Sequence, residues 1–482
     1  MTVSPAERAL QSRLTLTAHP LQRIGAYAIA ALAGRGHGPD MEPQDVSGDQ
    51  LDRVLELMTE HAIRAALVRD SKGPNGFWLK VSYSFFPNAP MNHPGNGKKT
   101  DDEIRAAVRK WRCLPEPASW PAAGCVLCGR QSVAFFGKVD VALAESESYR
   151  NTTPRGHAGM ALCRPCVASF HALPYGSQLT GGISYALHSW DESFLKQTVA
   201  RQVDRNLKLA ETGDGSRRPG EVREVLILTA LKNYGERLTA GVDLLIFSNS
   251  NRGQLMEIRS LEQPLAEWLR RLASARQKRG FTALVRAHVT ANTPGVVNLA
   301  RNAFGQPTKI VSSSLRRLAT TVTGAAPDRA EIADLAALLY SFVTEVLLMH
   351  EKDLSEIRAT ARNVAGLLNN ESTAGQLRKL RSSLREPIKL RQWLTGQGVT
   401  WAIKPPDGAD GPLVTERAYA LLFGPGPDNP AWFHRDLLLV GVLEQLSQLG
   451  WRATDPDQSD EDDDPLEGPD SDLIKDDTEV QQ

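Results

Sequence analysis

Two short stretches, CVLCGR at residues 125–130 and LCRPC at residues 162–166, dominate the interpretation of the first half of this chain. Each contains a Cys-x-x-Cys pair, and the whole sequence has only five cysteines. Two intervening residues allow a tight turn whose backbone amides point at the sulfurs, and two such turns supply four ligands for a tetrahedral ion. The pattern therefore predicts a structural Zn²⁺ site formed by Cys125, Cys128, Cys163 and Cys166, with no open position for a catalytic water.

Other interpretations of the four thiols stay open. Redox chemistry needs a single Cys-x-x-Cys pair, and four unligated structural cysteines would have no reason to be paired. His171 follows the second pair and offers an alternative ligand, while Cys113 is expected to be a small buried residue. Zinc can contribute on the order of 10 kcal/mol to folding, which would hold the loop-rich zinc segment, 113–175, in place.

Composition indicates an ordinary globular protein. The chain has 482 residues, of which 41% are hydrophobic and 23% charged, enough for two or three domains. No stretch approaches the roughly 20 apolar residues that span a bilayer, so we expect no membrane association. We expect a cytoplasmic protein, and in that reducing compartment paired cysteines favour metal over disulfides.

The formal net charge of zero hides a strong asymmetry along the chain. Residues 455–482 hold thirteen of the 56 acidic residues and one of the 56 basic residues, so the remainder carries a formal charge of +12. A basic body of this kind suits a polyanionic partner. The acidic end is too poor in apolar residues to fold by itself, so we expect a disordered tail over 454–482.

Hydrophobic periodicity and turn residues predict an α+β protein. The elements expected in its first part are a helix over 44–67, a strand over 77–86, a helix beginning after Thr100, strands over 223–231 and 242–250, a hairpin partner over 253–261 and a basic helix over 261–279. From about residue 326 the pattern is almost wholly helical. The predicted domains are therefore 1–325, a mixed N-terminal region with the zinc segment, 326–453, a helical bundle, and 454–482, the tail.

The loop over 87–99 is a candidate for contacts to nucleic acid. Asn88 and Asn92 offer side chains that hydrogen-bond base edges, and Lys98 and Lys99 suit a groove or phosphates. The alternative is that asparagines in a loop rich in Pro and Gly only build turns.

Basic residues on three predicted helices are further candidates for phosphate contacts. They are Arg105, Arg109, Arg270, Arg271, Arg378, Lys379, Arg381 and Arg385. Each phosphate contact would add to the salt dependence of binding. The alternative for each helix is a solvated surface with no partner.

The sequence contains no convincing catalytic motif. GNGKKT at 95–100 lacks the upstream glycine of a phosphate-binding loop, and HEKDL at 350–354 has leucine where a zinc-protease helix needs its second histidine. We therefore expect a binding component rather than an enzyme.

The order of these features resembles a known family. A helical start is followed by FFPNAP at 85–90, CVLCGR at 125–130, LCRPCVASFHALPYG at 162–176 and a helical last third. The chain in this respect is similar, over most of residues 15–450, to the CRISPR-associated CXXC–CXXC proteins, the large subunits of type I-B Cascade complexes. Paired Cys-x-x-Cys motifs are common in zinc proteins, and the FPN and LP sequences make the resemblance more specific.

The resemblance implies a non-catalytic role in antiviral defence. The expected partners are crRNA, target double-stranded DNA, the backbone, foot and small subunits of Cascade, and the helicase-nuclease. The N-terminal region would recognise the protospacer-adjacent motif and start duplex opening, and the helical region would stabilise the R-loop. Base pairing would then select the target, while the protein recognises shape and a short motif.

Two other functional classes stay open. One is a stand-alone zinc-containing regulator that binds nucleic acid, which two-fold DNA sites would favour. The other is a nuclease with an unrecognised site. The sequence shows neither a compact helix-turn-helix, which would favour the regulator, nor a cluster of carboxylates outside the tail, which would favour the nuclease.

Overall fold

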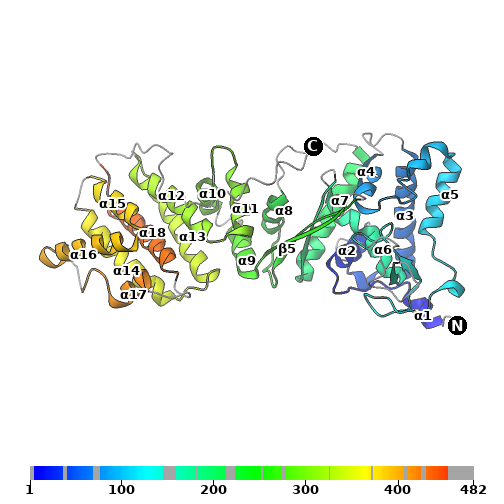
Figure 1. Cartoon of the computed structure of the whole chain (residues 1–482), viewed down its shortest axis with the longest axis horizontal. Helices are drawn as coiled ribbons and strands as arrows, with labels where there is room; N and C mark the ends of the chain where they lie inside the picture. Colours follow the sequence, from blue (N-terminus) through cyan, green and yellow to red (C-terminus); the bar gives the residue numbers. More distant parts are fainter. Residues whose placement is uncertain are drawn as a thin grey trace. The chain divides into compact units, whose positions relative to one another are not determined.

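The computed structural model describes residues 5–35, 41–68, 76–144, 159–179, 182–212, 223–250, 253–272, 278–324, 326–370, 373–406, 411–424 and 430–453. Over these residues the chain is a helix-rich α+β protein with two small sheets, as the sequence predicts (Figure 1). The predicted acidic tail, 454–482, lies outside them. Contacts divide the chain into two compact units, Met1–Ala266 and Glu267–Gln482, whereas the sequence predicts a boundary at 325/326.

The first unit is built mainly from helices. They are α1 (Pro5–Leu10), α2 (Pro20–Gly34), α3 (Gly48–Leu67), α4 (Phe77–Phe85), α5 (Asp101–Arg112), α6 (Arg164–Ala172), α7 (Glu192–Thr212) and α8 (Arg223–Lys232), with 3₁₀ turns η1 (Pro43–Asp45), η3 (Pro94–Lys98), η4 (Pro117–Ser119) and η5 (Leu173–Gly176). Local sequence explains where several begin. Ser47 with Gln50 and Thr100 with Glu103 form capping boxes at the starts of α3 and α5, which confirms the predicted N-cap at Thr100.

Two segments predicted as strands are helices. The stretch over 77–86 forms α4, and the stretch over 223–231 forms α8. Their aromatic and β-branched residues suggest strands, but the buried positions have helical spacing. Trp78, Val81, Ser82 and Phe85 are buried in α4, and α8 buries positions 224, 227, 228 and 231 in the same i, i+3, i+4, i+7 pattern. Burial against the rest of the unit therefore overrides local propensity.

The sheets are antiparallel and small. The larger has the order β3 (Gln178–Leu179), β4 (Ser184–Ser189), β5 (Val242–Ser250) and β6 (Gly253–Leu261). The predicted hairpin is confirmed, with β5 and β6 paired from Ser250↔Gly253 to Val242↔Leu261. The smaller sheet pairs β1 (Ala134–Phe136) with β2 (Met160–Leu162).

Helix α2 is the centre of the first unit. It packs against α6, α7 and η5, and almost all of its residues are buried. Gly25 allows the backbones of α2 and α6 to lie close together, because a Cβ atom there would lie 1.8 Å from the Ser169 carbonyl oxygen of α6. Gln22 adds a buried hydrogen bond of 3.1 Å to the Ser169 hydroxyl. This packing fixes α6, which carries part of the cysteine cluster.

The described elements of the second unit are all helices. They are most of α9 (Gln263–Leu272), then α10 (Lys278–Ala287), α11 (Gly295–Gly305), α12 (Lys309–Thr323), α13 (Arg329–Glu345), α14 (Glu351–Leu368), α15 (Gly375–Ser383), α16 (Pro387–Ile403), α17 (Glu416–Phe423) and α18 (Ala431–Leu449). Helix α18 packs against α12, α13, α14 and α17. Of the basic helix predicted over 261–279, α9 covers Gln263–Leu272 with its apolar side chains buried, α10 begins at Lys278, and residues 273–277 lie outside the described residues. Within the described part of the chain, no helix has the length and apolarity needed to cross a bilayer.

Candidate metal centre and nucleic-acid-binding residues

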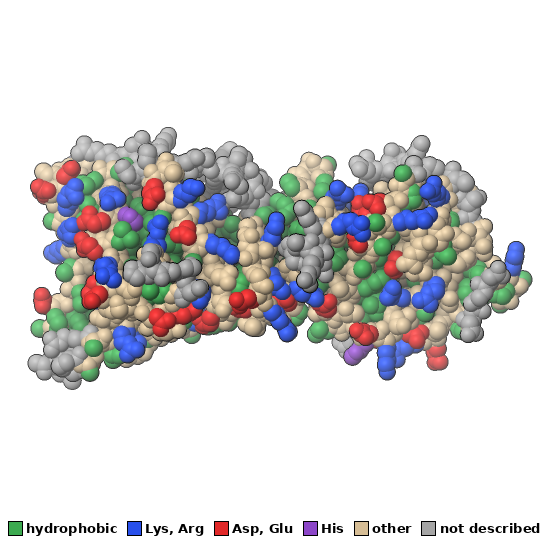
Figure 2. All heavy atoms as spheres, turned by 180° about the vertical axis from the view of Figure 1, so that it is seen from behind, with side chains coloured by type: hydrophobic (Ala, Val, Ile, Leu, Met, Phe, Trp, Pro, Cys, Tyr) green, Lys and Arg blue, Asp and Glu red, His purple; other side chains and the backbone are tan. Residues whose placement is uncertain are grey.

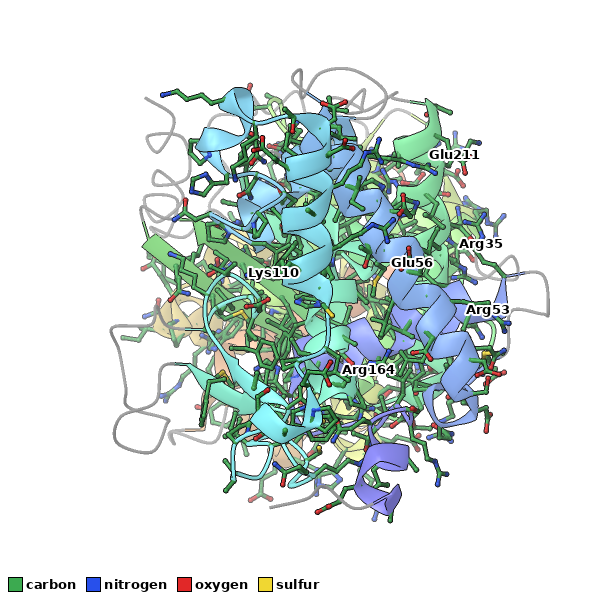
Figure 3. The ribbon with its side chains drawn as sticks, turned by 90° about the vertical axis from the view of Figure 1, so that its right-hand side faces the viewer. Arg35, Arg53, Glu56, Lys110, Arg164 and Glu211 are labelled. Carbon is green, nitrogen blue, oxygen red and sulfur yellow. The ribbon has the colours of Figure 1, made fainter. Side chains whose placement is uncertain are left out.

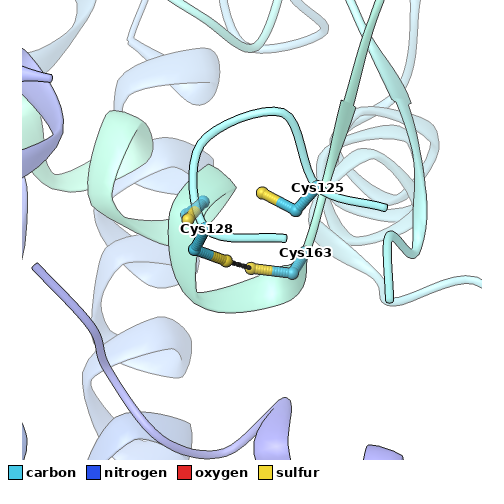
Figure 4. A group of neighbouring side chains, drawn as sticks. Cys125, Cys128 and Cys163 are labelled. Atoms are coloured by element: carbon cyan, nitrogen blue, oxygen red, sulfur yellow. Dashed lines mark hydrogen bonds between the residues drawn. The ribbon is translucent and has the colours of Figure 1, made fainter. Parts of the chain in front are cut away.

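The structure brings the four paired cysteines together. Their ligand atoms all lie within 4.8 Å of one another, and the Sγ atoms of Cys128 and Cys163 are 3.5 Å apart (Figure 4). A tetrahedral Zn²⁺ with Zn–S bonds of about 2.3 Å would separate its sulfurs by about 3.8 Å. Cys125, Cys163 and Cys166 are buried, and Cys128 is half-buried. The donor set, its spacing and its burial therefore fit a closed tetrahedral metal site.

The first pair sits on a tight turn between Gly124 and Gln131, which form an isolated antiparallel bridge. The Cys125 amide donates to the Arg130 carbonyl over 2.6 Å, and the Gly129 amide donates to the Cys125 carbonyl over 2.8 Å. Gly129 has a φ of +74°, which a residue without a Cβ adopts at no steric cost. The sulfurs of Cys125 and Cys128 point into the space between the labelled cysteines (Figure 4).

The second pair sits at the start of α6. Cys163 is the N-cap residue and Cys166 lies in the first turn, so both are near the partial positive charge of the helix N-terminus, which favours thiolates. The small sheet places the start of this helix next to the turn that holds the first cysteine pair. Ala134 of β1 pairs with Leu162 of β2, and the Val126 amide donates to the Ala161 carbonyl over 3.0 Å.

A glutamine near the N-terminus bridges the two cysteine turns. The buried Gln11 accepts a hydrogen bond of 2.9 Å from the Arg164 amide, and its own Nε2 donates over 2.9 Å to the Gln131 carbonyl. Arg130 in turn donates from Nη1 to the Arg13 carbonyl over 2.6 Å. Sequence reasoning missed Gln11, because a polar residue more than one hundred positions from either pair carries no local signal of this role.

The electrostatics of the cluster favour a cation. Hydrogen bonds from the Cys128, Cys163 and Cys166 thiols lower the pKa of Cys125. The hydrogen bonds with Cys125 are the first cause that raises the pKa values of Cys163 and Cys166, because a second thiolate would be repelled by the negative charge on Cys125. A divalent cation removes this conflict by stabilising all four thiolates together.

Two nearby residues lie apart from the cluster. Cys113 is exposed rather than buried, because it caps the C-terminus of α5, and its thiol lies 3.5 Å from the Leu114 carbonyl. This position corrects the expectation of a small buried residue. His171 faces Asp140, with 3.3 Å between Nε2 and Oδ1, and burial lowers its pKa to about 4. Its ring is therefore engaged on the side of α6 that also contacts Trp111.

The loop after α4 is a series of turns. Asn88 is exposed and has a φ of +64°, a left-handed conformation that Asn tolerates better than most residues. Asn92 is buried, and its Nδ2 donates to the Ser82 hydroxyl and the Phe86 carbonyl. Lys98 and Lys99 are exposed. The side chain of Asn92 thus holds the loop on α4, while the other three remain candidates for nucleic-acid contacts.

The candidate arginines differ in how far they are engaged within the chain. Arg109 of α5 forms ion pairs with Glu56 and Glu60 of α3, at 3.1 and 2.5 Å. Figure 3 shows these two helices side by side, with Glu56 next to α5. In the second unit, Arg270 pairs with Glu267 and Arg271 pairs with Glu345.

The remaining candidates lie on helices, except Arg385, which lies in the turn between α15 and α16. Arg105, Arg378, Lys379 and Arg385 are exposed, and Arg381 is half-buried. On the face shown in Figure 2, Lys and Arg side chains are interspersed with Asp and Glu, so the positive charge is not gathered into one field there. The roles of these residues in nucleic-acid binding stay predictions.

No family model matches this chain, and neither a curated protein nor a solved structure matches it.

Proposed function

We propose that Cys125, Cys128, Cys163 and Cys166 bind one structural Zn²⁺ ion. The four sulfurs are close enough to share a tetrahedral ion, and all four ligand positions come from the chain itself. A closed site of this kind stabilises the fold and activates no water. Its contribution would hold together two turns that are joined otherwise by a short sheet and by Gln11.

Elemental analysis of the purified full chain tests this proposal directly. We expect one zinc per chain for the wild type and for Cys113→Ser, and loss of zinc with a lower unfolding temperature for Cys166→Ser. Co²⁺ substitution adds a spectroscopic check, because a tetrahedral thiolate site gives intense visible and near-ultraviolet bands. The proposal would be refuted if the metal-free wild-type protein had the same unfolding temperature as the metal-loaded protein.

We further propose that the chain is the non-catalytic large subunit of a type I-B CRISPR surveillance complex. The observation that carries this proposal is the order along one chain of FFPNAP, the two cysteine pairs and a second unit whose described elements are helices. In this proposal crRNA, target DNA, the other Cascade subunits and the helicase-nuclease are the partners.

Co-purification tests the assignment to a guided complex. Tagged full-length chain, expressed with its neighbouring genes, is expected to carry a small RNA with a fixed 5′ handle together with the other subunits. A dimer that binds two-fold DNA sites without RNA would favour the stand-alone regulator. Metal-dependent cleavage of nucleic acid by the pure chain would favour a nuclease.

Binding of the assembled complex to duplexes with randomised flanks tests the proposed recognition loop. Alanine at Asn88, Lys98 and Lys99 is expected to change the preferred flank, whereas alanine at Lys110, an exposed lysine at the end of α5, is expected to leave it unchanged. Asn92→Ala belongs in a separate arm, because its side chain is part of the loop structure. An unchanged preference in the loop variants would place motif recognition elsewhere.

A further inference from the structure

A cavity in the first unit lies between α7, α8 and the sheet, apart from every residue discussed above as a site. Its volume is about 170 Å³. Tyr185, Ala186 and Leu187 of β4 line it, and α7 and α8, both labelled in Figure 1, form its walls. It is open to solvent on one side, which gives a ligand a route of entry.

Both walls present a complete helical stripe to the cavity. Helix α7 contributes Thr198, Arg201, Gln202 and Arg205, and α8 contributes positions 226, 229 and 230, with Asn233 just after its end. These are i, i+3, i+4, i+7 sets, so each helix faces the cavity along about two turns. The stripe of α7 is polar, although its neighbours on the same helix, among them Val199 and Val203, are buried in the core. The polar face of α7 is therefore turned towards the cavity and not towards the core.

Among the described residues that line the cavity, the charged side chains are all basic. Arg201 and Arg205 line it, and none of its described lining residues has a carboxylate. Arg201 connects α7 to the end of α8, because its Nη2 donates to the Asn233 carbonyl over 2.8 Å. Hydrogen-bonding groups on Gln178, Gln202 and Thr229 complete the lining.

The wall behind the arginines is held firmly. Asn206 of α7 is buried and donates from Nδ2 to three carbonyl oxygens, those of Pro174, Tyr175 and Ser177, over 2.8 to 3.0 Å. Gln202 donates to the Asn206 side chain over 2.9 Å, which orients an amide at the cavity. A polar surface that is preorganised in this way loses little conformational entropy when a ligand binds.

We propose that this cavity binds one nucleotide unit of a single-stranded nucleic acid. The two arginines would hold the phosphate by charge-assisted hydrogen bonds, and the base would lie against the Tyr185 ring within reach of the amides. Drug-sized pockets begin at about 300 Å³, so the smaller cavity here suits one base and its phosphate rather than a duplex. The inference rests on the proposed function only in taking the chain to bind nucleic acid.

Fluorescence anisotropy with labelled oligouridylate and oligothymidylate tests the cavity in the full-length chain. The two probes separate the sources of the same phosphodiester chemistry, RNA and DNA. For Arg205→Ala we expect roughly tenfold weaker binding and a salt slope that is smaller by about 0.7, the value for one phosphate contact on a single strand. Arg53→Ala removes the charge of an exposed arginine on α3 and is expected to leave binding unchanged.

A second variant pair separates ligand binding from folding. Thr229→Glu places a carboxylate at the exposed rim of the cavity, and Thr320→Glu is its control on α12, where the threonine is also exposed and its hydroxyl also bonds to the carbonyl four residues before it. Only Thr229→Glu is expected to weaken oligonucleotide binding, with unfolding temperatures equal in the two variants. If Thr229→Glu weakened the binding of only one probe, that probe would identify the ligand as RNA or as DNA.

Two outcomes would overturn the inference. One is wild-type binding that neither Arg205→Ala nor Thr229→Glu changes, and the other is no binding of either probe by the wild type. Neither outcome decides the proposed function, because co-purification of a guide RNA with the other subunits tests that separately. Conversely, binding in the cavity without a co-purifying RNA would support this inference and count against the guided complex.

Discussion

At the scale of single residues, the cysteine cluster combines a local and a distant contribution. The four thiols supply the chemistry, and their spacing already predicts a shared ion. Gln11 supplies a hydrogen bond to each cysteine turn and comes from a segment far away in the chain. Groups of this kind, outside the ligand set, orient ligands and raise metal affinity.

Gln11→Ala is expected to weaken zinc binding by about 10- to 100-fold while leaving all four ligands in place. The reason is that the Arg164 amide and the Gln131 carbonyl lose the side chain that joins them. Competition with a chromophoric zinc chelator measures the affinity. Gln392→Ala, at an exposed position of α16, serves as the control, and equal affinities in the two variants would contradict the bridging role.

A buried histidine in the second unit makes stability depend on pH without involving the thiols. Burial lowers the pKa of His288 from its ordinary value of 6.5 to about 4, and its Nδ1 bonds to the Leu284 carbonyl at 2.8 Å. The unfolded chain therefore binds the proton more tightly than the folded chain. The stabilisation is fully present above pH 6.5 and is lost as the pH falls towards 4, to a limit of about 3 kcal/mol.

His288→Asn is expected to reduce the loss of stability between pH 6.5 and 4, because asparagine does not titrate there. Urea unfolding at a series of pH values gives the slope. His350→Asn, which alters an exposed histidine before α14, is expected to keep the wild-type slope. A wild-type slope in His288→Asn would refute this source of acid sensitivity.

At the scale of elements, the sequence predicts ends and turns better than it predicts the type of a short element. Capping residues mark the start of α5, and the pairing of β5 with β6 is predicted from two strand-like stretches that are close together in the sequence. Helices α4 and α8 defeat the same reasoning. Their compositions suit strands, and only the neighbours that bury one face of each decide for a helix.

Gly25→Ala is expected to destabilise the first unit by about 2 kcal/mol, the usual range for overpacking a tight contact. The added methyl group would meet the Ser169 carbonyl at 1.8 Å and force α2 away from α6. Gly396→Ala, inside α16 with nothing near the added carbon, is expected to be neutral or slightly stabilising. Thermal unfolding compares them, and equal melting temperatures would show that α2 and α6 can separate without loss.

At the scale of the whole molecule, charge is distributed unevenly along the chain. The neutral total combines a basic body with the acidic residues of 455–482. Within the described residues many arginines are paired with carboxylates, so the excess charge is smaller locally than the count suggests. The last segment is therefore expected to weaken non-specific attraction to DNA.

Deleting residues 455–482 is expected to tighten non-specific binding to duplex DNA at low salt, because the formal charge rises from 0 to +12. The difference should shrink as salt increases, since the Debye length is about 10 Å at 0.1 M and shorter above it. A tail of the same length with serine and glutamine in place of its acidic residues separates charge from length. Equal affinity across a salt series would exclude an electrostatic role.

From the sequence it was possible to predict the four candidate metal ligands, the hairpin of β5 and β6 and the start of α5. Each Cys-x-x-Cys pair, the hairpin and the helix cap involve residues a few positions apart, so their signals are local in the sequence. The tertiary structure was needed to show that α4 and α8 are helices, that the two cysteine pairs meet and are joined by Gln11, and that the polar face of α7 lines a cavity. These features depend on which distant surfaces are buried together, and burial free energy outweighs local propensity.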